Sequence, residues 1–290
     1  MSVKKDIKNA REALKSLMVA HLEEISDSLI EQIMKNYSKL SPTNKVNAIK
    51  DVEAKGFGLY KAEMLKATAI VAQMALDGAR SEVPKAKKVE LSEWNEERVI
   101  LGEFEDLPPK IRKRLKSQVA LLMDTQKADL EKAIRYQYSS SEPSTDSEST
   151  IKHDLYETAS DWIDGRSVNA AADIMAARTI NETRQAFFFE KEVLEEIDAF
   201  IFKNDSPETP ICEDLSNNGA GKVFSADDPG WQRYQPPLHY NCDSYIVPVL
   251  KGKLNDEIEE LKPSSSDLEK YIQFHEKETG CECRVMLSRH

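Results

Sequence analysis

The sequence predicts an α+β fold: a mostly helical N-terminal half, followed by a C-terminal domain with a long helix and a small antiparallel β part. Through most of the chain, apolar residues recur at spacings of three and four, which is typical of helices that bury one face. The clearest strand pattern is Ser244–Leu250, which is rich in β-branched and aromatic residues, and residues 222–224 are a shorter candidate. Pro248 confines the longer strand to an edge or an end of the sheet.

Breakers divide the helical part into segments. Ser41-Pro42 ends the first helix because the residue before a proline avoids the α region, and the glycines at 56 and 58 interrupt the next stretch. Asp164-Gly165 is a turn, and Ser167 after it is a candidate N-cap. The predicted helical segments are 4–40, 59–79, about 94–101, 109–136, 151–163 and 168–202, the last with a break near Phe189.

One stretch has no large apolar residue. Residues 139–150, SSSEPSTDSEST, are serine, threonine, acid and one proline, so they cannot bury enough surface to order themselves. We expect a linker or mobile loop there. The predicted organisation is a helical domain at 1–138, the linker at 139–150, a second domain at 151–262, and a C-terminal helix and tail at 263–290.

Bulk composition excludes several classes. The formal charge of −11 argues against a dedicated nucleic-acid binder, which needs an excess of Lys and Arg. No run of about 18 apolar residues occurs, so no membrane partner is expected. The first residues lack the apolar centre of a secretory signal, so we expect the chain to stay in the compartment where it is made. Four cysteines are too few for a disulfide scaffold, and cytosolic thiols are normally reduced.

A basic cluster opens the predicted helix at 109–136. One interpretation is a solvated helix face without a specific function, and the functional alternative is contact with DNA or an acidic partner. No aromatic residue interleaves with the basic ones, so any DNA contact should be to phosphates and depend strongly on salt. The basic patch consists of Lys110, Arg112, Lys113, Arg114 and Lys116.

Two pairs of polar residues in the 168–202 segment lie four positions apart and so share a helix face. They are Arg178 with Glu182, and Asn181 with Gln185. The favoured interpretation is stabilisation of the helix surface by a few tenths of a kcal/mol.

Three blocks in the second half carry a family resemblance. They are ARTINETR at 177–184; Asp205 with TPICEDL at 209–215 and GKVF at 221–224; and PPLHYNCDS at 236–244 with IVPV at 246–249. In this order they resemble the phage Mu F-like head morphogenesis family, the minor head proteins of tailed phages, over roughly residues 155–250. The positions that match its motif are Arg178, Thr179, Glu182, Asp205, Cys212, Leu215, Pro237, His239, Cys242 and Pro248.

The chain lacks two cysteines that many members of the family have. Many members have Cys-x-x-Cys in the second block and Cys-Arg-Cys in the third, whereas here the corresponding positions are Thr209 and Ser244. Structural zinc needs four ligands, and the motif supplies three: Cys212, His239 and Cys242. Cys281, Cys283, Asp214 or Asp243 could supply a fourth. The favoured interpretation is no cofactor, with the two cysteines as small buried side chains and His239 as a polar residue that holds the loop.

Catalysis is not expected. A Cys212/His239 nucleophile pair lacks an evident orienting residue. Some relatives of the family are fused to ADP-ribosyltransferase modules, which use Glu-x-Glu, and Glu276-Lys277-Glu278 matches that string. In a chain with 51 acidic residues this match carries little weight.

The resemblance implies a non-catalytic minor capsid protein. Such a protein is a low-copy virion component, inside the head or near the portal, present in the host cytoplasm during procapsid assembly. The implied partners are the portal protein, the major capsid or scaffold protein, and packaged DNA. The alternatives are a DNA-binding ejection factor that uses the basic patch, and an ADP-ribosyltransferase-like enzyme or toxin.

Overall fold

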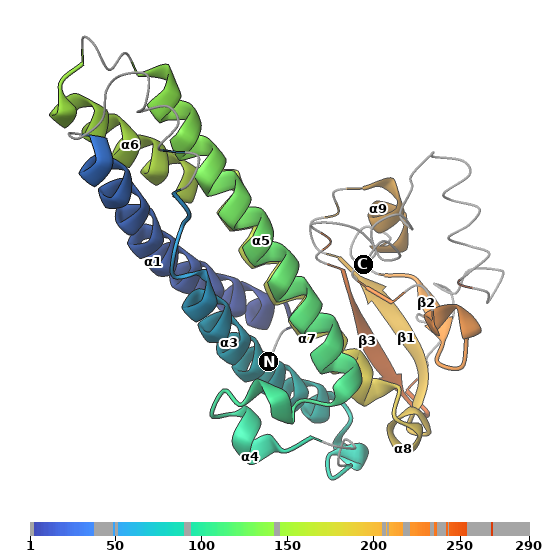
Figure 1. The fold of residues 1–290 in the computed structure, drawn as a ribbon. Helices are drawn as coiled ribbons and strands as arrows, with labels where there is room; N and C mark the ends of the chain where they lie inside the picture. The colour runs from blue at the N-terminus through green and yellow to red at the C-terminus, as the bar shows by residue number, and fades with distance from the viewer. Residues whose placement is uncertain are drawn as a thin grey trace. The chain divides into compact units, whose positions relative to one another are not determined.

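The structure of the 290-residue chain is a computed structural model. It describes residues 3–37, 49, 52–89, 94–141, 146–204, 207, 209–216, 221–232, 235–236, 242, 244–253 and 268. The helices are α1 (Val3–Tyr37), α3 (Phe57–Glu82), α4 (Glu96–Val99), α5 (Pro109–Ser140), α6 (Glu148–Ile163), α7 (Arg166–Phe188), α8 (Lys191–Leu194) and α9 (Pro210–Ser216). The strands are β1 (Ile197–Lys203), β2 (Val223–Ser225) and β3 (Tyr245–Leu250) (Figure 1).

The predicted α+β class is confirmed: the described residues are mostly helical, with one small antiparallel sheet. The five predicted helices before residue 164 correspond to α1, α3, α4, α5 and α6, with α4 shorter than expected. Both predicted strands are present, as β2 and β3. Of the predicted C-terminal helix and tail, only Leu268 lies among the described residues.

The prediction of helix through residue 202 is wrong at its end, where the chain forms β1. This strand is central in the order β2-β1-β3, with Phe200 opposite both Phe224 and Pro248. Its sequence IDAFIFK has apolar residues that fit a helical stripe as well as an alternating strand. Pairing with β2 and β3, which follow later in the chain, makes this segment a strand rather than a helix. Pro248 lies in an edge strand, as predicted.

Two expectations about helix ends are also corrected. Ser167 is not an N-cap, because α7 begins at Arg166 and only two residues separate it from α6. The segment 139–150 is partly helical: α5 continues through Ser140, and Ser147 caps α6 by accepting a hydrogen bond from the backbone N–H of Thr150. Serine is favoured at caps because its hydroxyl can bond nearby backbone, so a serine-rich segment need not be a linker. Residues 142–145 lie outside the described residues.

The chain forms two compact units, which differ from the predicted division at 139–150. The sheet unit comprises 1–10, 68–115 and 173–290, and the helical unit comprises 11–67 and 116–172. The boundaries fall inside α1, α3, α5 and α7. A boundary within a continuous helix leaves no mark in composition, so the sequence could not reveal it.

The helical unit has a buried polar contact at its centre. Tyr60 of α3 is fully buried, stacks on His21 of α1 with ring centroids 5.2 Å apart, and donates a hydrogen bond to Oε1 of Gln126 of α5 at 2.9 Å. Burial raises the pKa of Tyr60, and the bond to Gln126 opposes this effect. The phenol therefore stays neutral well above pH 10.

We expect Tyr60→Phe to lower the free energy of unfolding by about 1–2 kcal/mol at pH 7, because Oε1 of the buried Gln126 loses its donor. Since the pKa of Tyr60 is higher in the folded than in the unfolded chain, the wild type should lose stability as pH rises above about 10, the pKa of unfolded tyrosine. The variant should lose less over the same range. Urea titrations at pH 7 and pH 10.5 measure this, and equal losses in both proteins would contradict it.

The sheet unit is built around aromatic side chains on one face of the sheet. Phe200 of β1 and Phe224 of β2 both meet the ring of Trp231 edge-on, at centroid distances of 5.5 and 6.0 Å. Phe187 and Phe188 at the end of α7 belong to the same core. Ala199, Val223 and Val249 form a smaller apolar cluster, which residue alternation along β1 assigns to the opposite face. Burial on both faces rigidifies the part of the sheet from which the candidate site is built.

Candidate functional site

A line of buried polar side chains runs along α7 in the sheet unit. We call Asn181, Arg184 and Gln185 the α7 seam; their spacing of three and four places them on one helix face. All three are at most 4% exposed. The favoured interpretation of helix-surface stabilisation is therefore wrong for Asn181 and Gln185, which bond other segments.

The seam holds the C-terminal segment by its backbone. Asn181 donates to the carbonyl oxygen of Ser244 at 3.0 Å, and Gln185 donates to that of Pro236 at 2.6 Å. These bonds satisfy backbone carbonyls outside or just before β3, where the sheet ladder does not reach. The segment that carries the third sequence block is thus tied to the helix that carries the first.

Arg184 is the strongest anchor of the seam. Its guanidinium makes a two-pronged ion pair with Glu82 of α3, at 2.6 and 2.9 Å, and donates to the carbonyl oxygen of Ile246 in β3 at 3.0 Å. It also lies 5.0 Å from the ring centroid of Phe188. A planar fork of donors suits this arrangement, because a lysine ammonium cannot meet a carboxylate with two parallel hydrogen bonds.

Two cysteine side chains of the sheet unit lie close to each other. Sγ of Cys212 in α9 lies 3.7 Å from Sγ of Cys242, and both residues are buried. The hydroxyl of Ser244 donates to Sγ of Cys212 at 3.4 Å and accepts from Asn204 at 2.9 Å. The second and third sequence blocks therefore also meet, through these side chains.

Within this cluster, Cys212 is held as a neutral thiol. The hydrogen bond with Cys242 and then burial raise the pKa of Cys212, while Ser244 and Thr209 act in the opposite direction. A thiol held protonated is a poor nucleophile. Among the residues that the structure describes, no group of three metal-ligating side chains is found, and of the motif's three candidate zinc ligands only Cys212 and Cys242 lie there. His239 and the cysteines at 281 and 283 lie outside the described residues.

The motif positions are distributed as follows. Arg178 and Glu182 are partly buried on α7, and Thr179 is fully buried beside them. Glu182 accepts a hydrogen bond from Arg114 at 2.6 Å. Cys212 and Leu215 are buried in α9, Cys242 is buried before β3, Pro248 is in β3, and Asp205, Pro237 and His239 are outside the described residues.

The basic patch is partly neutralised by acidic neighbours. Arg114 pairs with Glu182 at 2.6 Å, and Arg112 contacts both the backbone oxygen and, at 3.6 Å, the carboxylate of Glu105. Lys110, Lys113 and Lys116 are exposed on α5, and Lys116 belongs to the helical unit. The arrangement favours the solvated helix face, with its charge reduced by intramolecular pairs.

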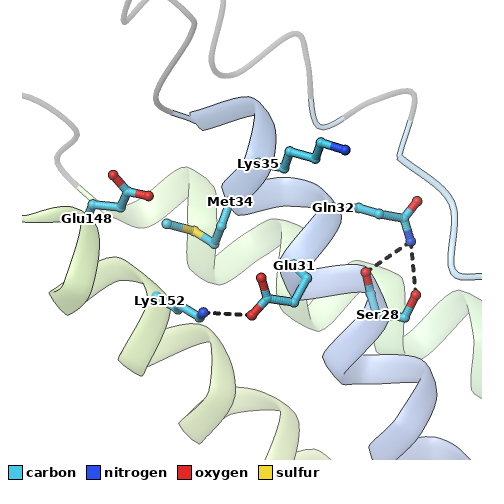
Figure 2. A pocket seen from close by; sticks show the side chains of 7 residues that line it. All are labelled: Ser28, Glu31, Gln32, Met34, Lys35, Glu148 and Lys152. Atoms are coloured by element: carbon cyan, nitrogen blue, oxygen red, sulfur yellow. Dashed lines mark hydrogen bonds and ion pairs between the residues drawn. The ribbon is translucent and has the colours of Figure 1, made fainter.

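An open pocket of about 600 Å³ lies in the helical unit between α1 and α6 (Figure 2). Lys152 pairs with Glu31 at 2.6 Å, and its hydrogen bond is the largest cause that lowers the pKa of Glu31. Tyr156 donates to the same carboxylate at 3.1 Å. The lining carries two acidic and two basic side chains, so its formal charges cancel. Its lining is Ser28, Glu31, Gln32, Met34, Lys35, Glu148 and Lys152.

The sequence missed the anchoring role of Arg184, Glu82 and Asn204. One signal was available for Arg184: it lies among apolar residues of the α7 stripe, where a charge must be paired if the stripe is buried. Glu82 and Asn204 carry no comparable signal, because each depends on a contact with a distant segment.

None of the described helices is long and apolar enough to cross a membrane. Comparisons of the chain with protein-family models, curated proteins and solved structures gave no match, so its resemblance to the Mu F-like family stays a prediction.

Proposed function

We propose that this chain is a minor head protein of a tailed phage. It is a low-copy virion component that acts with the portal, scaffold or major capsid protein in procapsid assembly, and in the packaging or delivery of DNA, without catalysing a reaction. One observation supports this most: residues of the three sequence blocks on which the resemblance rests contact one another in a single compact unit.

The bonds among the blocks suit a structural rather than a catalytic role. The seam residues bond backbone carbonyls, and Cys212 is held as a neutral thiol. These side chains therefore hold segments of the chain together. In this proposal the sheet unit is a rigid body locked by its motifs, and helical surfaces make the protein–protein contacts. The ion pairs of Arg112 and Arg114 weigh against the DNA-binding alternative.

Mass spectrometry of purified procapsids and virions from a culture that produces this chain tests the proposal. We expect its peptides in both particles at a few copies each, measured against isotope-labelled standards, with the major capsid protein as the positive control. A non-structural phage protein is the negative control. Absence of the chain from both particles would contradict a minor head protein.

Loss of the gene separates assembly from delivery. Accumulation of empty or aberrant procapsids would place the function in assembly, whereas filled heads that fail to infect would place it in DNA delivery. Incubation of the purified chain with labelled NAD tests the enzyme alternative, and label transfer to protein would overturn the non-catalytic proposal.

A further inference from the structure

We propose that Cys212 and Cys242 form a reversible disulfide that fastens α9 to the segment before β3. Their sulfurs are 3.7 Å apart, whereas a disulfide bond is about 2.05 Å long. An approach of less than about 2 Å closes the bond, and rotation of the two side chains supplies it. This inference is independent of the proposed function, and it revises the expectation of reduced thiols.

The surrounding bonds hold the two cysteines in place. On one side, the N–H of Cys212 donates to Oγ1 of Thr209 at 3.4 Å, and the end of α9 is tied back by a 2.7 Å bond from Gly221 to Ser216. On the other side, Ser244, two residues after Cys242, is bonded by Asn181 and Asn204. Because these bonds already hold the two thiols facing each other, oxidation requires little reorganisation of the backbone.

A small disulfide such as oxidised glutathione serves as the oxidant and accepts the two electrons that the thiols lose. The thiolate of one of the two cysteines attacks one glutathione sulfur and releases a glutathione thiol, leaving a mixed disulfide. The thiolate of the other cysteine then attacks the protein sulfur of the mixed disulfide and releases the second glutathione thiol. Two electrons pass from the protein to the oxidant, and the two thiol protons end on the released glutathione.

The local environment sets the rate of this step. Because both cysteines are buried, access of the oxidant limits the reaction, which should therefore be slow. The hydroxyl of Ser244 donates to Sγ of Cys212 and stabilises the thiolate that does form. Burial of both sulfurs should also slow reduction of the finished bond.

The bond joins positions 30 residues apart and should stabilise the sheet unit. Restriction of the unfolded chain by a loop of this size predicts a rise in Tm on the order of 5–10 °C after oxidation. Thioglycolate or dithiothreitol should reverse the rise.

Peptide mapping of the full wild-type chain tests the bond directly. After oxidation with oxidised glutathione at pH 8.5, thiols are blocked and the chain is digested with trypsin without reduction. Cleavage after Lys203, Lys222, Arg233 and Lys251 places the two cysteines in separate peptides, 204–222 and 234–251. We expect a reducible species with their combined mass less two hydrogens.

Two variants provide controls. Cys281→Ser/Cys283→Ser should keep both the linked species and the Tm shift, whereas Cys212→Ala should lose both. If Cys212→Ala does not fold, the wild-type mapping still decides. Unlinked peptides 204–222 and 234–251 after oxidation, or a linkage of Cys212 or Cys242 only to the thiols at 281 and 283, would overturn the proposal.

Discussion

Replacing Arg184 with methionine is expected to lower the free energy of unfolding of the sheet unit by about 3 kcal/mol. The change leaves the carboxylate of Glu82 without its two-pronged partner and the carbonyl oxygen of Ile246 without a donor. Removing one member of a buried pair costs about 3–5 kcal/mol. We expect the lower end because the Glu82 side chain is 22% exposed and can recruit water.

The pair Arg114–Glu182 provides a matched control, because its Glu182 lies on α7 with Arg184. The two carboxylates are similarly exposed, at 18% for Glu182 and 22% for Glu82, but the Arg114 side chain is 48% exposed against 3% for Arg184. Water can therefore fill the place of Arg114, and Arg114→Met should cost less than about 1 kcal/mol although its 2.6 Å contact is equally short. Urea unfolding followed by tryptophan fluorescence compares the two, and amide exchange of β1 assigns the loss to the sheet unit. If both variants lose the same free energy of unfolding, burial does not determine how much the Arg184–Glu82 pair stabilises the protein.

A double variant separates loss of the pair from loss of one charge. Arg184→Met/Glu82→Leu removes both charges, so it should be more stable than Arg184→Met alone. Arg184→Lys should fall between wild type and Arg184→Met, because a lysine keeps the charge but cannot form the fork. A double variant less stable than the single one would contradict an unpaired Glu82 as the cause.

Gly221→Ala is expected to lower the free energy of unfolding by about 3–4 kcal/mol. Gly221 has φ of +84°, which costs a residue with a side chain about 1–3 kcal/mol. A methyl group there would also overlap the carbonyl oxygen of Phe202 and lie 2.5 Å from Cγ2 of Ile201. Relieving this overlap by shifting β1 adds about 1–3 kcal/mol.

Gly252 isolates the steric part of that cost. Its φ is +71°, but nothing lies within 4 Å of where its methyl group would be. Gly252→Ala should therefore cost only about 1 kcal/mol of backbone strain. Urea unfolding of the two variants measures the difference, and similar costs would mean that close approach to β1 contributes nothing.

Sequence reasoning found the long helices because their apolar spacing is a local property. It also placed Pro248 on an edge or end strand, since a proline has no backbone N–H to donate to the ladder. It failed at β1, where IDAFIFK satisfies two periodicities at once. Local pattern cannot choose between them, because the deciding hydrogen bonds come from β2 and β3, which follow later in the chain.

The candidate site divides in the same way. The sequence by itself determined the α+β class, the positions of most helices and the three blocks that resemble one family. Only the tertiary structure decided that Arg184 is a buried anchor, that Glu182 pairs with Arg114, and that Cys212 faces Cys242. The physical reason is that burial and pairing belong to contacts between distant segments, whereas periodicity, turn chemistry and charge are carried by neighbouring residues.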